Sequence, residues 1–136
     1  MLRYELGDKV FMNGLRLYYE RYYNVNALTE DFKCVMEEVS GKNLDKFFQQ
    51  WPYTAGQPEL VIRNEKSRKK GITDVYIEQK QIPLFEFSLE LLIKDSSGER
   101  LEKVAVKERV TKIEVPSIGA VLITPDPNIN LLFKQK

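Results

Sequence analysis

The spacing of the apolar residues changes once along this chain, and no other feature of the sequence constrains the fold as strongly. Up to about Trp51 the apolar residues recur at the three- and four-residue spacing of one helix face. From about Glu59 onward they alternate or form short β-branched runs between turn residues. The sequence therefore predicts an α+β chain. A short helical segment of about three helices, residues 1–56, should precede a small antiparallel β-sandwich, residues 57–136.

The expected helices have apolar stripes and recognisable ends. The expected N-caps are Asp8, Thr29 and Asn43. Gly7, Gly41 and Pro52 are residues at which a helix should stop. The first of these helices carries two apolar rows, which are Phe11, Leu15, Tyr18 and Tyr22, and Val10, Gly14 and Leu17. Three helices and one sandwich cannot easily cover so wide a face, so the isolated chain is expected to self-associate through it.

Short strands are expected in the second part, separated by polar links such as residues 95–98. Their regular spacing is typical of an antiparallel sandwich. The expected strands are residues 60–63, 74–80, 85–93, 104–107, 110–115 and 120–124. After a turn at Pro125 and Pro127, the apolar tail 129–133 is expected to pack onto the rest of the chain.

Charge and composition narrow the possible partners. The chain has 21 Lys and Arg against 20 Asp and Glu, and 43% of its residues are hydrophobic, which is typical of a folded protein. Neither part has the basic excess that phosphate binding requires, so a nucleic-acid partner is not expected. No run approaches the roughly 20 apolar residues needed to span a bilayer, so a membrane partner is not expected. The compartment is left undetermined.

The chain has no histidine and a single cysteine, Cys34. Histidine is the commonest metal ligand and the commonest general base, and one thiol cannot form a ligand cluster or a disulfide within the chain. We therefore expect no catalytic, cofactor-binding or metal-binding residue in this segment. Cys34 has no histidine or second cysteine beside it to activate its thiol, so a quiet structural role is expected.

Other groups of reactive or charged residues have ordinary structural interpretations. The helical carboxylates are Asp8, Glu30, Asp31, Glu37, Glu38 and Asp45, and capping or solvation explains them better than acid–base chemistry. The tyrosine row is Tyr18, Tyr19, Tyr22 and Tyr23, whose helical spacing favours packing in the core or against a neighbouring domain. The basic run is Lys66, Arg68, Lys69 and Lys70, which a solvated hairpin loop explains best because no aromatic residue is interleaved for base stacking.

The order of residues across the first part resembles the last helices of the catalytic domain in aminopeptidase-N-like zinc peptidases. The matching residues are Leu6, Gly7, Asp8, Phe11, Gly14, Leu15, Arg16, Tyr18, Thr29, Asp31, Phe32, Ser40, Gly41, Leu44, Asp45, Phe47, Phe48, Gln50, Trp51, Gly56 and Pro58. The second part is similar, more weakly, to the β-sandwich that follows that domain in the family. The residues that carry this second likeness are 56–60, the glutamine-containing strand 75–80, residues 83–93, and Asp126, Pro127 and Asn128 before Leu131 and Leu132.

The resemblance implies a parent enzyme in which zinc-bound water attacks the first peptide bond of a substrate. Zinc is therefore expected in the parent and not in this segment. The family's HExxH helix, second zinc-binding glutamate and glycine-rich substrate-binding motif lie upstream of the matched segment and do not occur here. Tyr4 does not match the tyrosine that stabilises the tetrahedral intermediate, and no catalytic role passes to it.

The resemblance implies that this segment is a non-catalytic scaffold whose main partner is the remainder of the parent peptidase chain. A stand-alone protein-binding module derived from a peptidase-like fold is an alternative that the absence of histidine fits equally well. A third possibility is an unrelated α+β protein that binds a partner through the basic hairpin near Lys69.

Overall fold

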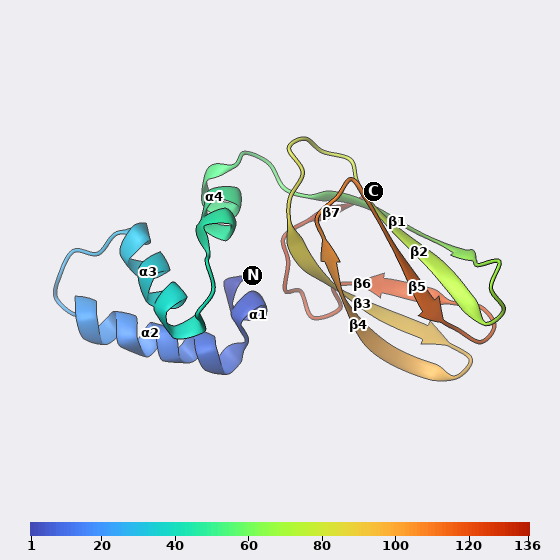
Figure 1. The fold of residues 1–136 in the computed structure, drawn as a ribbon, viewed down its shortest axis with the longest axis horizontal. Coiled ribbons are helices and arrows are strands. Elements are labelled where there is room, and N and C mark those ends of the chain that lie inside the picture. Colours follow the sequence, from blue (N-terminus) through green and yellow to red (C-terminus); the bar gives the residue numbers. More distant parts are fainter. The chain divides into compact units, whose positions relative to one another are not determined.

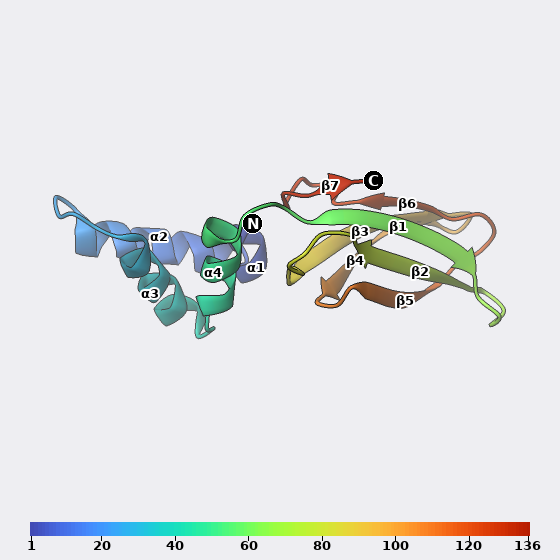
Figure 2. The same ribbon diagram turned by 90° about the horizontal axis from the view of Figure 1, so that it is seen from above.

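The computed structural model describes all 136 residues, which form four helices and seven strands. The chain divides into two compact units, Met1–Ala55 and Gly56–Lys136. The helices lie in the first unit and the strands in the second, as two views of the ribbon show (Figures 1 and 2). The predicted α+β class is confirmed. No helix combines the length and the apolar character that crossing a bilayer requires.

Glycines separate the helices of the first unit. The helices are α1 (Leu2–Leu6), α2 (Asp8–Tyr22), α3 (Thr29–Ser40) and α4 (Asp45–Tyr53). Gly7, with φ of 83°, ends α1 and precedes α2. Gly41 ends α3 in the left-handed conformation, with φ of 65°, and its N–H donates to the Glu37 carbonyl at 2.8 Å. The short helix α1 adds one to the three expected, and Gly7 is its predicted stop.

Each predicted N-cap lies one residue away from the observed N-cap. Asp8 and Thr29 are the first residues of their helices, one position inside the cap. At α3 the side chain that caps is Asp31, which accepts the backbone N–H of Leu28 at 2.7 Å. Asn43 does contribute to the start of α4, because its Oδ1 accepts the N–H of Asp45 at 3.1 Å. The starts of α2, α3 and α4 therefore each lie beside a glycine or a polar side chain, one residue away from the predicted N-cap position.

The core of the helical unit is small. Its buried centre consists of Leu6, Met36, Leu44 and Phe48. The partly buried residues packed around it are Leu2, Val10, Phe11, Leu15, Phe32, Val39 and Phe47. Gly14 is the only buried residue of α2, and a Cβ there would lie 2.5 Å from Met36 Sδ and 3.1 Å from Val39 Cγ2. Gly14 therefore permits the close approach of α2 and α3.

The second unit contains two sheets. Its strands are β1 (Glu59–Lys66), β2 (Ile72–Gln79), β3 (Phe87–Asp95), β4 (Gly98–Val106), β5 (Val110–Pro116), β6 (Leu122–Pro125) and β7 (Lys134–Gln135). One sheet has the order β5-β2-β1-β7 and the other β4-β3-β6. All strand pairs are antiparallel except β1 with β7, which is parallel. The predicted antiparallel sandwich is confirmed, with β7 as an unpredicted parallel addition.

Alternation of side chains positions the sandwich core. Along β3 the residues Phe87, Leu89, Leu91 and Ile93 are buried, while those between them are only partly buried. The predicted start of β4 near residue 104 is wrong, because that strand begins at Gly98 and pairs with β3 from Asp95↔Gly98 onward. Its first half is polar, so ladder hydrogen bonds to β3, and not apolar content, extend it.

The polar side chain of Gln79 is completely buried at the end of β2 and connects three parts of the sandwich. Its Nε2 donates to the carbonyls of Phe85 at 2.9 Å and Glu108 at 3.2 Å, and its Oε1 accepts the N–H of Phe85 at 3.0 Å. The Gln81 side chain donates to the same Oε1 at 2.6 Å. One amide therefore satisfies backbone groups of the β2–β3 and β4–β5 connections.

The C-terminal tail is held by a different polar residue. Asp126 is buried, and its carboxylate accepts the N–H groups of Asn130 and Leu131, each at 2.9 Å. The prediction that the apolar tail packs down is wrong in part, since Ile129 is 88% exposed and Leu132 is 58% exposed. The turn at Asp126, and not apolar burial, directs the chain into β7.

Replacing Gln79 by leucine should destabilise the sandwich by about 3 kcal/mol, because buried backbone groups lose their partners at roughly 1–3 kcal/mol each. Urea unfolding followed by far-ultraviolet circular dichroism reports on the whole chain, while the fluorescence of the single tryptophan, Trp51, reports on the helical unit. A change in the circular dichroism transition that Trp51 fluorescence does not follow therefore belongs to the sandwich. The matched control is Gln135→Leu on exposed β7, which should change stability by less than about 0.5 kcal/mol. Equal effects of the two variants would contradict the assigned role of Gln79.

Candidate functional site

The helical carboxylates, examined first as possible catalytic groups, serve as caps and ion-pair partners. Glu38 pairs with Arg21 at 2.6 Å, and Asp8 pairs with Arg3 at 2.7 Å. Lys33 lies between Asp45 at 2.7 Å and Glu30 at 2.8 Å. The remaining two carboxylates accept backbone N–H groups: Asp31 that of Leu28 and Glu37 that of Leu44, both at 2.7 Å.

The ion pairs of Lys33, Arg3 and Arg21 favour the charged forms of the paired groups whose pKa they shift. The hydrogen bond from Lys33, then that from Asn43, lowers the pKa of Asp45. The hydrogen bonds to Asp45 and Glu30 raise the pKa of Lys33. The hydrogen bonds from Arg3 and Arg21 likewise lower the pKa of Asp8 and Glu38, whereas a general acid needs a raised pKa.

Metal-ligating side chains do not converge anywhere in the structure. No group of three or more His, Cys, Asp or Glu residues is arranged to hold a metal ion. Cys34 is exposed on α3, beside the buried stripe residues Val35 and Met36. The donor set of this chain therefore does not fit a zinc site.

The tyrosine row forms a surface hollow at the end of α2. Tyr18 and Tyr22 have ring centroids 5.1 Å apart, Tyr19 and Tyr23 have theirs 5.2 Å apart, and Tyr18 meets Phe32 edge-on. The hollow has a volume of about 380 Å³. Tyr19 and Tyr23 are 64% and 59% exposed, so half of the row lies outside the core of this chain.

A second hollow in the helical unit is almost entirely apolar. It has a volume of about 360 Å³, and its lining residues are Met1, Leu2, Phe32, Phe47, Phe48, Trp51 and Pro52. The rings of Phe47 and Trp51 lie 6.3 Å apart, and both side chains are only partly buried. Aromatic surface left open in this way is characteristic of an interface.

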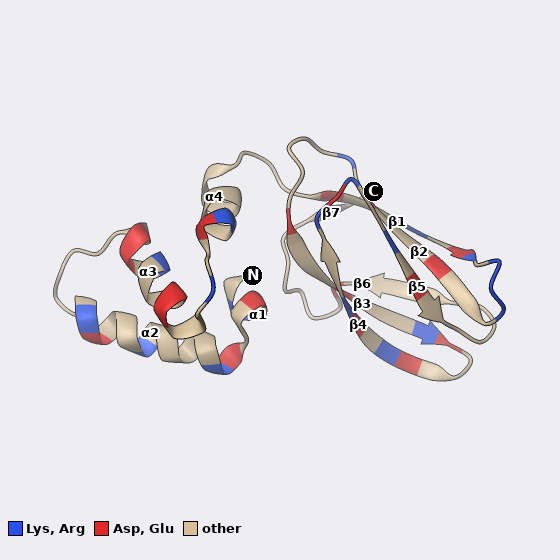
Figure 3. Cartoon of the chain, viewed as in Figure 1, with Lys and Arg blue, Asp and Glu red and all other residues tan.

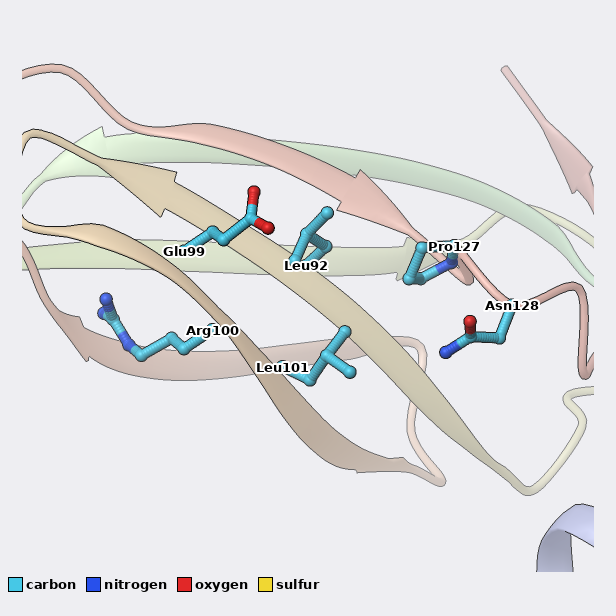
Figure 4. A pocket seen from close by; sticks show the side chains of 6 residues that line it. All are labelled: Leu92, Glu99, Arg100, Leu101, Pro127 and Asn128. Atoms are coloured by element: carbon cyan, nitrogen blue, oxygen red, sulfur yellow. The ribbon is translucent and has the colours of Figure 1, made fainter.

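The sandwich has a hollow of its own on the solvent side of β3 and β4. Leu92 and Leu101 pair across these strands, and Figure 4 shows their side chains with Glu99, Arg100, Pro127 and Asn128 around them. Leu101 is 52% exposed. The Asn128 side chain donates to Glu90 at 2.6 Å. No titratable side chain is buried in this hollow, so we assign no chemistry to it.

The basic run lies in the loop between β1 and β2, as its polar composition predicts. Lys66 ends β1, Ile72 begins β2, and the side chains of Lys66, Arg68, Lys69 and Lys70 are exposed. Figure 3 shows Lys and Arg colour along most of this loop, at one end of the sandwich. We call residues 66–71 the basic finger.

A buried carboxylate organises the loops at the same end. Asp95 accepts hydrogen bonds from the N–H and hydroxyl of Ser97 at 2.7 and 2.5 Å, and from the N–H of Ile118 at 3.2 Å. Its side chain is 1% exposed, and Arg100 lies 3.6 Å away. The bonds from Ser97, then that from Ile118, lower the pKa of Asp95 to about 2. The sequence alone indicates only a polar turn here, because the partner at Ile118 is distant in the chain.

The helical unit is similar to a known family of peptidases. Residues 1–51 match the Peptidase family M1 domain. The puromycin-sensitive aminopeptidase of Caenorhabditis elegans is 35% identical over 75 residues, which are 55% of this chain and 8% of that protein. The aminopeptidase M1-D of Oryza sativa subsp. japonica is 36% identical over 84 residues, which are 62% of this chain and 9% of that protein.

The fold is also that of a known peptidase segment. The crystal structure of Legionella pneumophila aminopeptidase A in complex with aspartic acid superposes with a TM-score of 0.86 over the whole of this chain, which covers 16% of that one. The sequence identity in this match is 18%, so it shows the fold.

The chain resembles a C-terminal segment of an aminopeptidase-N-like metallopeptidase. The resemblance expected from the sequence is confirmed, and it rests on the helical unit for the family match and on the full chain for the fold. This aminopeptidase-N-like segment spans less than a tenth of the length of the two relatives described above.

Acid should weaken the sandwich through Asp95. Its folded pKa of about 2 lies below the ordinary value of 3.8, so its stabilising effect is complete above that value and is lost as the pH falls toward 2. Asp95→Asn should lower stability at neutral pH and remove this part of the acid dependence, as measured by urea unfolding across that range. Glu99→Gln, in the same hairpin, is the control. Parallel pH curves for Asp95→Asn and the unsubstituted chain would refute the assignment.

Proposed function

We propose that this chain is the non-catalytic C-terminal part of a zinc aminopeptidase and acts as a scaffold for the catalytic domain. In this proposal residues 1–56 are the last helices of a peptidase-like catalytic domain, and residues 57–136 are the β-sandwich domain that follows it. The parent would remove N-terminal residues from peptides. The observation that carries the proposal is the match of residues 1–51 to the Peptidase family M1 domain together with the fold likeness over the whole chain.

The packing of the helical unit supports a scaffold role. The fifteen residues of α2 bury only Gly14, and the apolar hollow around Phe47 and Trp51 stays open. A protein domain that folded for itself alone would cover more of this surface, since burial is worth roughly 25 cal/mol per Å² of apolar area. The remainder of the parent peptidase chain is the proposed cover.

The chemistry of the parent belongs outside these residues. The chain contains no histidine, and its carboxylates do not converge on a metal position. Zinc and the residues that bind it are therefore assigned to the upstream part of the proposed parent. Within this proposal the segment contributes no catalytic, cofactor-binding or metal-binding residue.

A stand-alone protein-binding module derived from a peptidase-like fold is the second candidate. The same open aromatic hollow favours it, because Phe47, Trp51 and Met1 could receive an apolar partner of another chain. The two candidates differ in which chain supplies the surface that covers the hollow. In the first candidate it is the remainder of the parent chain, and in the second it is a separate protein.

Sequencing the source gene upstream of the Met1 codon separates them. We expect an open frame that continues back into HExxH and a second glutamate one helix further on. The longer chain should then hydrolyse aminoacyl-amide substrates in a zinc-dependent manner, and deleting residues 1–136 should abolish its folded, active form. A stop codon immediately upstream would overturn the scaffold proposal and favour the stand-alone module.

The isolated chain is expected to self-associate through its uncovered helical apolar surface. Sedimentation velocity from micromolar to millimolar concentration should show a rising average mass, and Trp51→Gln should shift this rise to higher concentration. Tyr53→Gln, at a 68% exposed position outside the hollow, is the matched control. A monomer throughout the range, with native circular dichroism, would contradict the idea.

A further inference from the structure

Backbone hydrogen bonds hold the basic finger in a defined conformation. The N–H of Ser67 donates to the carbonyl of Ile72 at 3.1 Å, and the N–H of Ile72 donates to the carbonyl of Lys69 at 3.3 Å. From the neighbouring loop, the N–H of Ser117 donates to the carbonyl of Gly71 at 2.9 Å. The finger therefore projects its side chains from a fixed backbone.

Lys69 of the finger and Lys112 of β5 have partners within the sandwich. Lys69 Nζ contacts both carboxylate oxygens of Glu114, at 2.9 and 2.7 Å. Lys112 pairs with Asp74 at 2.8 Å. These pairs connect the finger and β2 to β5, and they leave the charges beyond them unneutralised.

The remaining cations of the finger have no partner in the chain. Lys66, Arg68 and Lys70 are exposed and form no ion pair. Their charge is thus concentrated at one end of a sandwich whose overall balance, 14 basic and 12 acidic residues, is close to neutral. An anionic surface that met this end would encounter three cations at once.

An isoleucine is exposed beside the finger. Ile118 follows Ser117 and is 63% exposed. Its backbone is held on both sides, because its N–H donates to Asp95 at 3.2 Å and its carbonyl accepts the N–H of Ser96 at 3.1 Å. These two hydrogen bonds hold the backbone of Ile118 in place, while its apolar side chain stays exposed.

We propose that this end of the sandwich, formed by Lys66, Arg68, Lys70 and Ile118, docks on the surface of an anionic phospholipid membrane. Clustered lysine and arginine are attracted to anionic headgroups, and an adjacent apolar side chain inserts at the headgroup boundary. The contact is peripheral and needs no spanning helix, so it departs from the expectation of no membrane partner, which rested on the lack of a spanning segment. It is independent of the proposed peptidase function.

The same observations disfavour nucleic acid as the occupant. No aromatic residue lies in the finger for base stacking, and only one of its cations is an arginine able to make a bidentate base contact. An exposed isoleucine favours contact with the apolar boundary of a lipid surface and disfavours contact with a polar nucleic-acid groove. Two of the three free cations are lysines, which suffice for attraction to headgroups.

The test measures cosedimentation of the 136-residue chain with large unilamellar vesicles. Vesicles of phosphatidylcholine alone should not bind it, whereas vesicles that also contain phosphatidylserine should, and raised salt should weaken this binding. The triple variant K66Q/R68Q/K70Q should lower the partition constant on the order of 100-fold. Ile118→Ser should lower it by a smaller factor, about 10-fold or less, with an unchanged salt dependence.

The matched control is K9Q/R16Q/K107Q, which removes two lysines and one arginine from exposed positions elsewhere and leaves the same net charge. It should keep at least half of the binding. Equal loss in both triple variants, or no binding of the unsubstituted chain at low salt, would overturn the proposal. Preferential binding of a DNA duplex, used as a competing probe, would overturn it in favour of nucleic acid. Unchanged urea midpoints confirm that the variants are folded.

Discussion

The helical unit depends on one close contact, in which Met36 occupies the space that Gly14 leaves open. Because a side chain at position 14 would collide with Met36 and Val39, the missing Cβ sets how near α2 can lie to α3. The small core of Leu6, Leu44 and Phe48 forms around Met36. Around this small core, much of the aromatic surface of α2 and α4 stays open. The incomplete burial is the structural basis of the proposal that this segment belongs to a larger chain.

The sandwich is stabilised differently from the helical unit. Its apolar interior is well covered, and the residues that decide its connections are polar and buried. Gln79 satisfies the backbone of two loops, Asp95 joins the β3–β4 turn to Ile118, and Asp126 turns the chain toward β7. A buried polar group without a partner costs more than a formed hydrogen bond contributes. Such residues therefore fix one loop arrangement among many that would bury the same apolar area.

The chain carries its open apolar surfaces and its unpaired cations in separate units. The open apolar surfaces lie on the helices, where the family match is also found, and the free cations lie at one end of the sandwich. No described group converges on a metal. The molecule is therefore characterised by an open apolar surface on its helices and by exposed cations on its sandwich.

Local sequence determined most of the secondary structure. The apolar periods predicted the α+β class and six of the seven strands, and glycines at 7 and 41 predicted two helix ends, because these depend on side-chain spacing and backbone freedom nearby. It also determined that histidine-based chemistry is absent. Only the tertiary structure decided that Asp31 caps α3, that β4 begins at Gly98, that β7 pairs in parallel, and that the side chains of Gln79 and Asp95 are buried and hydrogen-bonded to distant backbone. Each of these depends on a partner that is either far along the chain or set by the exact helix register, which periodicity does not encode.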